Sequence, residues 1–214
     1  MKNAIVIGAT GMVGTRLIQS LIEDVHYSEI VSLVRHASGI SHSKLHEHII
    51  NFDEPETWKK LVTGDVLFST LGTTIAQAKS KEAQFVVDFT YQYEVAKAAA
   101  ANGVTHYVLV SSAGASATSK IFYPKMKGQL EDAIKSLPFK CISILRPGQL
   151  EGPRIQNRPV EKIALSVMHA INKLGLLKCY RPILDVQLAK AMIHAATKTS
   201  SATYTLNEVF ELVD

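Results

Sequence analysis

A cluster of glycines near the N-terminus constrains the fold of this chain more than any other feature. The cluster follows the apolar run Ala4–Ile7, which is typical of a buried strand. Apolar residues then recur at helical spacing, at Val13, Leu17, Ile18, Leu21 and Ile22. A glycine turn between strand and helix allows a tight exit, close approach to a pyrophosphate and close packing. Its position predicts a dinucleotide site at the helix N-terminus, formed by Gly8, Ala9, Thr10, Gly11, Met12, Val13 and Gly14.

The rest of the chain repeats a rhythm of short apolar run, turn and amphipathic stretch. A long helix is expected at about 83–101, with Gly103 as its left-handed cap. Strands that are apolar on both faces and alternate with helices indicate a parallel sheet covered on both sides. The expected fold class is therefore α/β, a doubly wound, mostly parallel sheet of the Rossmann type. Its strands are expected at Ala4–Ile7, Ile30–Val34, about His48–Phe52, Asp65–Leu71, Tyr107–Ser111 and Cys141–Leu145.

The length of 214 residues fits a single domain, residues 1–214. The stretch of about 152–214 carries helical patterns at Pro159–Leu174 and Val186–Thr197 and a strand-like Ala202–Leu206. This stretch is short for an independent domain. We expect it to form a small lid of helix and strand on the substrate side of the sheet.

The residue that follows the second strand predicts the choice of cofactor. An acidic residue there binds the ribose hydroxyls of NAD, whereas a cation accommodates the extra phosphate of NADP. Here the strand ends at Val34 and is followed by Arg35, and Arg16 in the first helix could reach the same phosphate. NADP is the expected cofactor, with NAD left open. Further contacts are expected from Asp53, toward the adenine amino group, and from Thr70, Leu71 and Gly72, which pass close to a ribose.

A candidate catalytic set follows the fifth strand. Ser112 stands at its end, and Tyr123 and Lys127 are spaced to share one face of a helix. A nearby ammonium lowers the pKa of a phenol, so the tyrosine could act as acid or base while the serine holds the substrate oxygen. The spacing occurs again at Tyr93–Lys97, which we interpret as a solvated helix face. Only Tyr123–Lys127 follows serines at the carboxyl end of a strand, where ligands bind in such folds.

Proline at position 124 complicates this set. A residue before proline is pushed away from the α region, and proline itself suits the first turn of a helix. Tyr123 is therefore expected at the helix cap, with a geometry toward Lys127 that departs from a regular pair.

The order of these motifs resembles the atypical branch of the short-chain dehydrogenase/reductase superfamily, similar to NmrA-like proteins and the Tat-interacting-protein oxidoreductase group. The matching features are the glycine turn, Arg35, the paired serines, the run from Tyr123 to Glu131, and Leu145-Arg146-Pro147-Gly148. The resemblance implies a catalytic trio of Ser112, Tyr123 and Lys127, with Ser111 as the alternative to Ser112. It also implies that Lys127 contacts the nicotinamide ribose and that Ser111, Pro147 and Gly148 lie near the cofactor.

The resulting hypothesis is an NADP-dependent oxidoreductase acting on a small carbonyl or hydroxyl compound of unknown identity. Two alternatives stay open. One is an NAD(P)-sensing regulator without chemistry, of the NmrA-like kind, and the other is an enzyme like the nucleoside-diphosphate-sugar epimerases. A protein partner or a second copy of the chain is compatible with each of these hypotheses.

Composition excludes other classes of function. The net charge is +4, but the 23 Lys and Arg are scattered without a block of like charges, so nucleic acid is not an expected partner. No apolar run approaches the roughly 20 residues of a membrane helix. His42, His46 and His48 lack the further ligands of a tetrahedral site, so no metal is expected. Two cysteines without a pairing pattern favour a reducing, cytoplasmic location.

Overall fold

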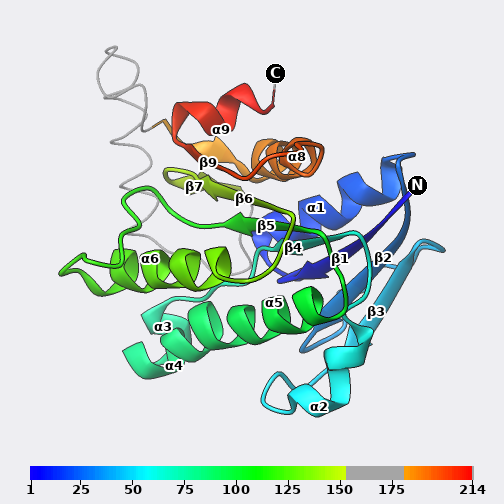
Figure 1. Ribbon diagram of the computed structural model, residues 1–214, viewed down its shortest axis with the longest axis horizontal. Coiled ribbons are helices and arrows are strands. Elements are labelled where there is room, and N and C mark those ends of the chain that lie inside the picture. The colour runs from blue at the N-terminus through cyan, green and yellow to red at the C-terminus, as the bar shows by residue number, and fades with distance from the viewer. Residues whose placement is uncertain (153–180, 214) are drawn as a thin grey trace.

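A computed structural model describes residues 1–152 and 181–213 of the chain. Its centre is a sheet of seven parallel strands in the order β3-β2-β1-β4-β5-β6-β9 (Figure 1). The order reverses between β1 and β4, which is where ligands bind in sheets of this kind. The strands are β1 Lys2–Ile7, β2 Tyr27–Val34, β3 Leu45–Ile49, β4 Val66–Ser69, β5 His106–Val110, β6 Cys141–Arg146 and β9 Ala202–Thr205.

Helices cover both faces of the sheet (Figure 1). The longer ones, α1 (Met12–Glu23) and α8 (Asp185–Ala195), cover one face, and α5 (Gln92–Ala101) and α6 (Phe122–Lys135) cover the other. The expected doubly wound α/β fold is therefore confirmed. The shorter helical segments are α2 Pro55–Trp58, η1 Lys59–Leu61, α3 Ile75–Ala78, α4 Lys81–Phe85, the π-helix η2 Val86–Tyr91 and α9 Asn207–Glu211.

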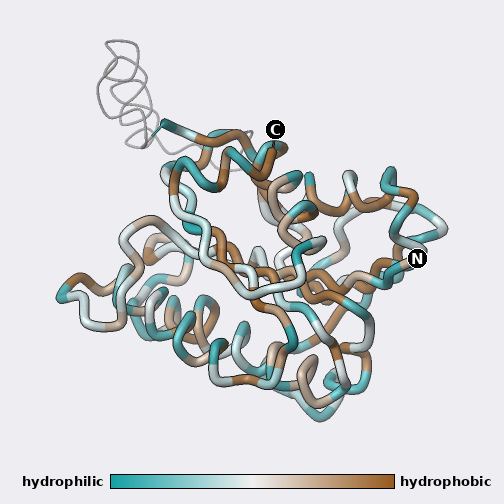
Figure 2. The backbone as a smooth tube through the Cα atoms, turned by 45° about the horizontal axis from the view of Figure 1, so that its top comes forward, coloured by the Kyte–Doolittle hydropathy of each residue, from teal (hydrophilic) through white to brown (hydrophobic). Residues whose placement is uncertain are grey.

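Two hydrophobic cores lie between the sheet and these layers. Along β1, Ala4 and Val6 face the core under α1 and α8, whereas Ile5 and Ile7 face the core under α5 and α6. Much of the chain through the central strands is coloured as hydrophobic in Figure 2. Burying each large apolar side chain contributes about 1.5–3 kcal/mol. Burial on both faces is why these strands read as unbroken apolar runs in the sequence.

The expected third strand and the expected long helix differ from the structure, and the second strand begins at Tyr27 rather than at Ile30. The third strand was expected at about His48–Phe52, but β3 is Leu45–Ile49, because Phe52 turns into the core and its ring lies 6.1 Å from that of Trp58. The helix expected at 83–101 is helical throughout but contains the π-helical turn Val86–Tyr91. Its expected end is confirmed, because Gly103 has φ +83°.

The C-terminal stretch joins the main sheet at β9, and α8 packs against α1. A small second sheet pairs β7 (Leu150–Glu151) with β8 (Ile183–Leu184) in parallel. The expected helix at 186–197 and strand at 202–206 are confirmed by α8 and β9. The helical pattern at 159–174 lies outside the described residues, and the assignment of 152–214 as a lid stays a prediction.

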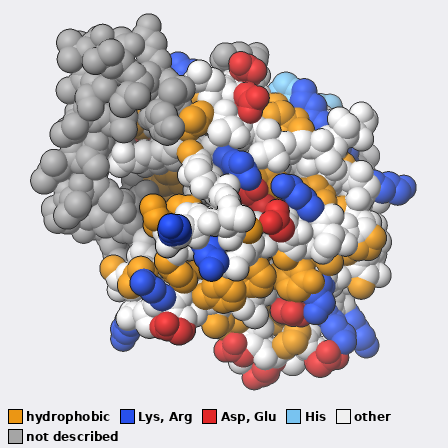
Figure 3. Space-filling model, turned by 60° about the vertical axis from the view of Figure 1, so that its left-hand side comes forward, with side chains coloured by type: hydrophobic (Ala, Val, Ile, Leu, Met, Phe, Trp, Pro, Cys, Tyr) orange, Lys and Arg blue, Asp and Glu red, His pale blue; other side chains and the backbone are white. Residues whose placement is uncertain are grey.

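Within residues 1–152 and 181–213, no helix is long and apolar enough to span a membrane. Figure 3 shows one face of the molecule, on which basic side chains are interspersed with acidic and hydrophobic ones.

A buried histidine lies at the amino end of the sheet, opposite the expected ligand edge. The His106 ring nitrogen Nε2 is 3.0 Å from the hydroxyl of Ser143, which in turn donates to the carbonyl of Ala195 at 3.3 Å. Burial, and secondarily the charge of Lys2, lowers the pKa of His106 from 6.5 to about 4. The folded protein therefore holds this ring neutral, whereas the unfolded chain protonates it below about pH 6.5.

The stabilisation by neutral His106 should be complete above pH 6.5 and decline as the pH falls toward 4. Integrated over the two pKa values, the loss between pH 8 and pH 5 is about 2 kcal/mol. Urea unfolding of the wild type and of His106→Gln at both pH values measures it, with the exposed His36→Gln as control. Equal pH dependence in His106→Gln and the wild type would contradict this assignment.

Candidate functional site

The glycine turn joins β1 to α1 at the carboxyl edge of the sheet. Gly8 has φ +82°, and a Cβ there would lie 2.5 Å from the backbone nitrogen of Leu71. A Cβ on Gly14 would overlap the carbonyl of Gly8, and the N–H of Gly11 donates to that same carbonyl at 2.9 Å. Only glycine satisfies both the left-handed backbone at position 8 and the lack of space at position 14.

The turn leaves backbone donors unused at the start of α1. The N-cap residue Gly11 has no side chain to cap the helix. The N–H groups of Met12, Val13 and Gly14 donate to no atom of the described residues. Free N–H groups at a helix N-terminus favour an anion. These unused donors at the start of the helix fit the pyrophosphate of a dinucleotide.

The segment after β4 lies against this turn. Thr70 donates from its backbone N–H and its hydroxyl to the carbonyl of Ile7, at 3.0 and 2.9 Å, and Leu71 contacts the position of Gly8. A Cβ on Gly72 would approach the carboxylate of Asp88 at 3.3 Å. The structure thus brings the predicted residues of positions 70–72 beside the glycine turn.

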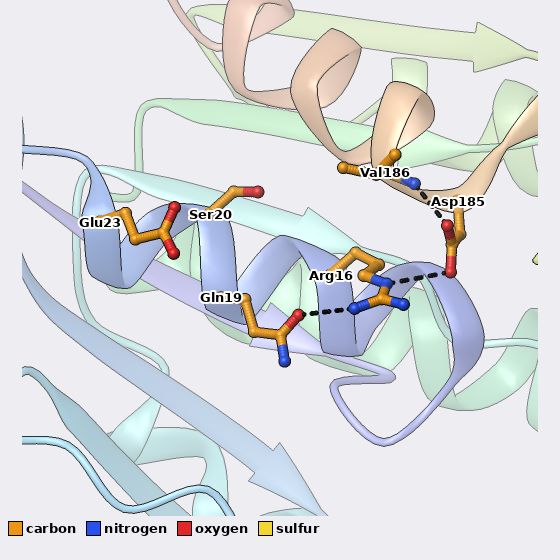
Figure 4. Close-up of a pocket in the computed structure, with 6 residues that line it drawn as sticks. All are labelled: Arg16, Gln19, Ser20, Glu23, Asp185 and Val186. Atoms are coloured by element: carbon orange, nitrogen blue, oxygen red, sulfur yellow. Dashed lines mark hydrogen bonds and ion pairs between the residues drawn. The ribbon is translucent and has the colours of Figure 1, made fainter. Parts of the chain in front are cut away.

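The two arginines expected near the extra phosphate of NADP differ in their contacts. Arg35 is exposed directly after β2 and has no hydrogen-bond or ion-pair partner within the described residues. Arg16 forms an ion pair with Asp185 at 3.2 Å and donates to Gln19 at 3.1 Å (Figure 4). It lines a cavity of about 330 Å³ between α1 and α8. The ion pair with Asp185 holds the Arg16 charge against α8, and the expectation that Arg16 reaches the same phosphate as Arg35 stays a prediction.

Asp53 has a partner that the sequence did not predict. The hydroxyl of Tyr91 donates to Asp53 Oδ1 at 2.7 Å, and the Tyr91 ring stacks on Phe52 with centroids 5.2 Å apart. Burial first, and then the bond to Asp53, raises the pKa of Tyr91 to about 12. The phenol is therefore protonated, and available as a donor, at neutral pH.

The two serines after β5 have different surroundings. The Ser111 hydroxyl donates to Glu131 Oε1 at 2.5 Å, and Arg146 donates to both oxygens of the same carboxylate, at 2.9 and 2.5 Å. Glu131 is 1% exposed, and its hydrogen bond raises the pKa of Arg146 above the usual value. The Ser111 hydroxyl is thus part of a structural hydrogen-bond network with Glu131 and Arg146.

Ser112 is the serine left free. Its hydroxyl oxygen is shielded from solvent and has no hydrogen-bond partner among the described residues. The next residue, Ala113, donates its N–H to the carbonyl of Pro147 at 2.9 Å, so the predicted Pro147-Gly148 segment lies beside the serine turn. An unpaired buried hydroxyl is costly, and one at a ligand-binding edge indicates a partner that arrives with a ligand.

Lys127 is buried under the same edge. Its ammonium donates to the carbonyl of Val110 at 3.3 Å and lies 4.0 Å from the carboxylate of Asp88, and both side chains are almost fully buried. Burial raises the pKa of Asp88, while the charge of Lys127 and the N–H of Thr73 oppose this. Because Asp88 accepts from Thr73 at 2.8 Å, it links the lysine to the segment after β4.

Tyr123 lies one turn before Lys127 on α6. The helix begins at Phe122, so the expectation that Tyr123 forms its cap is wrong, and Ile121 is the N-cap. Pro124 fits because the first-turn N–H groups have no partner within the helix. Tyr123 is 39% exposed, and its hydroxyl bonds to no described residue. The second match, Tyr93–Lys97, has Lys97 paired with Glu94 at 3.1 Å on an exposed helix face.

Comparison with known proteins agrees with this geometry. A family model described as NAD(P)H-binding matches residues 8–164. The chain is 34% identical over 207 residues to "Protein fmp52, mitochondrial" of Aspergillus clavatus, covering 92% of this chain and 88% of that protein. It is 37% identical over 208 residues to the protein of the same name from Emericella nidulans, with the same coverage. The expectation of a cytoplasmic location is contradicted, because these relatives are named mitochondrial.

Solved structures share the fold. The Bordetella bronchiseptica enzyme WbmH in complex with NAD+ matches with a TM-score of 0.71 at 15% identity, over 99% of this chain and 79% of that one. The UDP-glucose 4-epimerase of Thermotoga maritima with UDP-glucose matches with a TM-score of 0.69 at 15% identity, over 99% and 81%. Together with the family match, these confirm the resemblance to the atypical short-chain dehydrogenase/reductase superfamily.

Replacing Glu131 by Gln should destabilise the protein by roughly 2 to 3 kcal/mol, because the partly buried Arg146 is left without its counter-charge. The exposed neighbour Asp132→Asn is the control and should stay within about 0.5 kcal/mol of the wild type. Urea unfolding at pH 7 measures both. A Glu131→Gln protein as stable as the control would contradict the role of this network.

Proposed function

Since this chain belongs to the family of NAD(P)H-binding proteins, we propose that it is an NADP-dependent oxidoreductase acting on a small carbonyl or hydroxyl compound. The observation that carries the proposal is the unpartnered hydroxyl of Ser112. It lies at the same edge of the sheet as the unused N–H groups of the glycine turn and the buried ammonium of Lys127. An anion site, an oxygen-binding group and a cation at one edge suit hydride transfer to a carbonyl.

Each residue of the candidate site has its own role in the proposed reaction. The N–H groups at the start of α1 would bind the pyrophosphate, and Lys127 would bind the nicotinamide ribose. When bound, the reduced dinucleotide supplies a hydride to the carbonyl carbon of the substrate. The hydroxyl of Ser112 holds the carbonyl oxygen, and Tyr123 transfers its proton to that oxygen as the new hydroxyl forms. Asp88 and the Val110 carbonyl hold the ammonium of Lys127 in place.

The choice of NADP rests on Arg35. Its guanidinium is exposed after β2 without a partner in the described part of the chain, and no carboxylate occupies the residues that immediately follow the strand. A free arginine matches the 2′-phosphate of NADP, whereas NAD is usually held there by an acidic residue.

A specific observation favours a second candidate, a regulator that senses NADP without chemistry. The Tyr123 hydroxyl has no bond to Lys127, whose ammonium instead lies beside Asp88. A tyrosine that is not coupled to the lysine would lack the means to lower its pKa. The names of the fungal relatives also support placing either activity in mitochondria.

Fluorescence titration with NADPH and NADH tests the cofactor. The wild type should bind NADPH at least about tenfold more tightly, because Arg35 adds a charge-assisted bond to the phosphate. Arg35→Ala should lose this preference, and Arg16→Ala, whose charge pairs with Asp185, should keep it. Equal affinities in the wild type would contradict the choice of NADP, and binding of neither cofactor would contradict the proposed function.

Turnover of a panel of aldehydes and ketones with NADPH tests the catalytic set. Ser112→Ala and Tyr123→Phe should each lower kcat by about a hundredfold or more while NADPH still binds. Tyr93→Phe, from the second Tyr–Lys pair, should be unaffected. Full turnover by Tyr123→Phe would overturn its role as the acid, and a partner protein bound by only one redox form, without turnover, would favour the sensor.

A further inference from the structure

The last residue of the π-helix η2 reaches the edge of the sheet where the adenosine end of the cofactor is expected. Tyr91 lies against Phe52, and Phe52 is itself buried beside Trp58. The ring is therefore fixed from one side by packing. A π-helical turn displaces the side chains that follow it relative to a regular α-helix, and such turns are frequent at functional sites.

The hydroxyl of Tyr91 fixes the carboxylate of Asp53. It donates to Oδ1 at 2.7 Å, and the backbone N–H of Asp53 donates to the side chain of Asn51 at 3.1 Å. The second carboxylate oxygen, Oδ2, accepts no hydrogen bond within the described residues, and Asp53 is exposed, so this oxygen is open to a ligand. A carboxylate oxygen can only accept, so the group that it would bind is an N–H or O–H donor.

Arg35 completes the arrangement. It lies close enough to Tyr91 for its charge to lower the pKa of that phenol, against the larger opposing effects of burial and of Asp53. A free cation and a held acceptor thus lie at the ends of neighbouring strands. An adenosine 2′-phosphate presents the matching pair, a phosphate for the cation and a 6-amino group for the acceptor.

We propose that Tyr91 is a specificity-determining residue that holds Asp53 so that its second oxygen accepts a hydrogen bond from the adenine amino group. The inference rests on the proposed function, because it assumes that a dinucleotide binds at this edge. Tyr91 acts through Asp53 and is therefore a positioning residue. Its effect should be confined to the recognition of the base.

A pair of cofactors separates base recognition from general binding. In reduced nicotinamide hypoxanthine dinucleotide phosphate, a carbonyl oxygen replaces the amino group, and a fixed carboxylate repels it. Fluorescence titration should show that the wild type binds NADPH about tenfold more tightly than this analogue. Tyr91→Phe keeps the ring but frees the carboxylate, so the preference should fall to about threefold or less.

Matched variants make the result specific. Asp53→Ala should lose the same preference, and the double variant should lose no more than either single one, because both act on one contact. Tyr93→Phe, two residues further along in α5, should keep the preference of the wild type. The inference would be overturned if Tyr91→Phe kept the full preference for NADPH over the hypoxanthine analogue, or if the wild type showed no such preference. In either case, binding of NADPH would still support the proposed function. Binding of neither cofactor would overturn both.

Discussion

The buried carboxylate of Glu131 is the interaction on which the geometry of the candidate site depends. It joins α6 to the ends of β5 and β6 through Ser111 and Arg146. Removing a carboxylate from water is costly, and it is tolerated here because the guanidinium and the hydroxyl satisfy it. Tyr123, Lys127 and Glu131 are spaced four residues apart and lie along one stripe of the helix. Fixing Glu131 therefore fixes the rotation of α6 and the placement of the other two.

The same network decides which serine is available. Ser111 and Ser112 are neighbours in the sequence, but only Ser111 is bound to Glu131, and Ser112 keeps a shielded hydroxyl without a partner in the described structure. Asp88 links Lys127 to the segment after β4, and this segment lies against the glycine turn. The buried pair of Lys127 and Asp88 thus connects the expected catalytic edge to the expected phosphate site.

The sequence predicted the features that depend on local pattern. The glycine turn, the strands apolar on both faces and the cap at Gly103 each follow from a few neighbouring residues. The third strand was misplaced because its ends are set by pairing with β2, where Ile30 lies opposite Leu45. The ion pair of Arg16 was not predictable because its partner, Asp185, lies 169 residues further along the chain.

The residues of the candidate site were also predictable only in part. The place of Ser112, Tyr123 and Lys127 after the fifth strand predicted them as catalytic residues. No sequence pattern predicted Asp88 or Tyr91, which belong to a π-helical turn. Glu131 was visible only as part of a resemblance, and its bonds emerged from the fold. The compartment was misjudged because cysteine content reports on redox conditions, which do not distinguish cytosol from other reducing compartments.

A crystal structure of the protein with NADP+ bound would show whether the dinucleotide lies at this edge of the sheet. We expect the pyrophosphate on the N–H groups of Met12, Val13 and Gly14, the 2′-phosphate on Arg35, and the nicotinamide beside Ser112. A dinucleotide bound away from the glycine turn, or a nicotinamide remote from Ser112, would contradict this expectation.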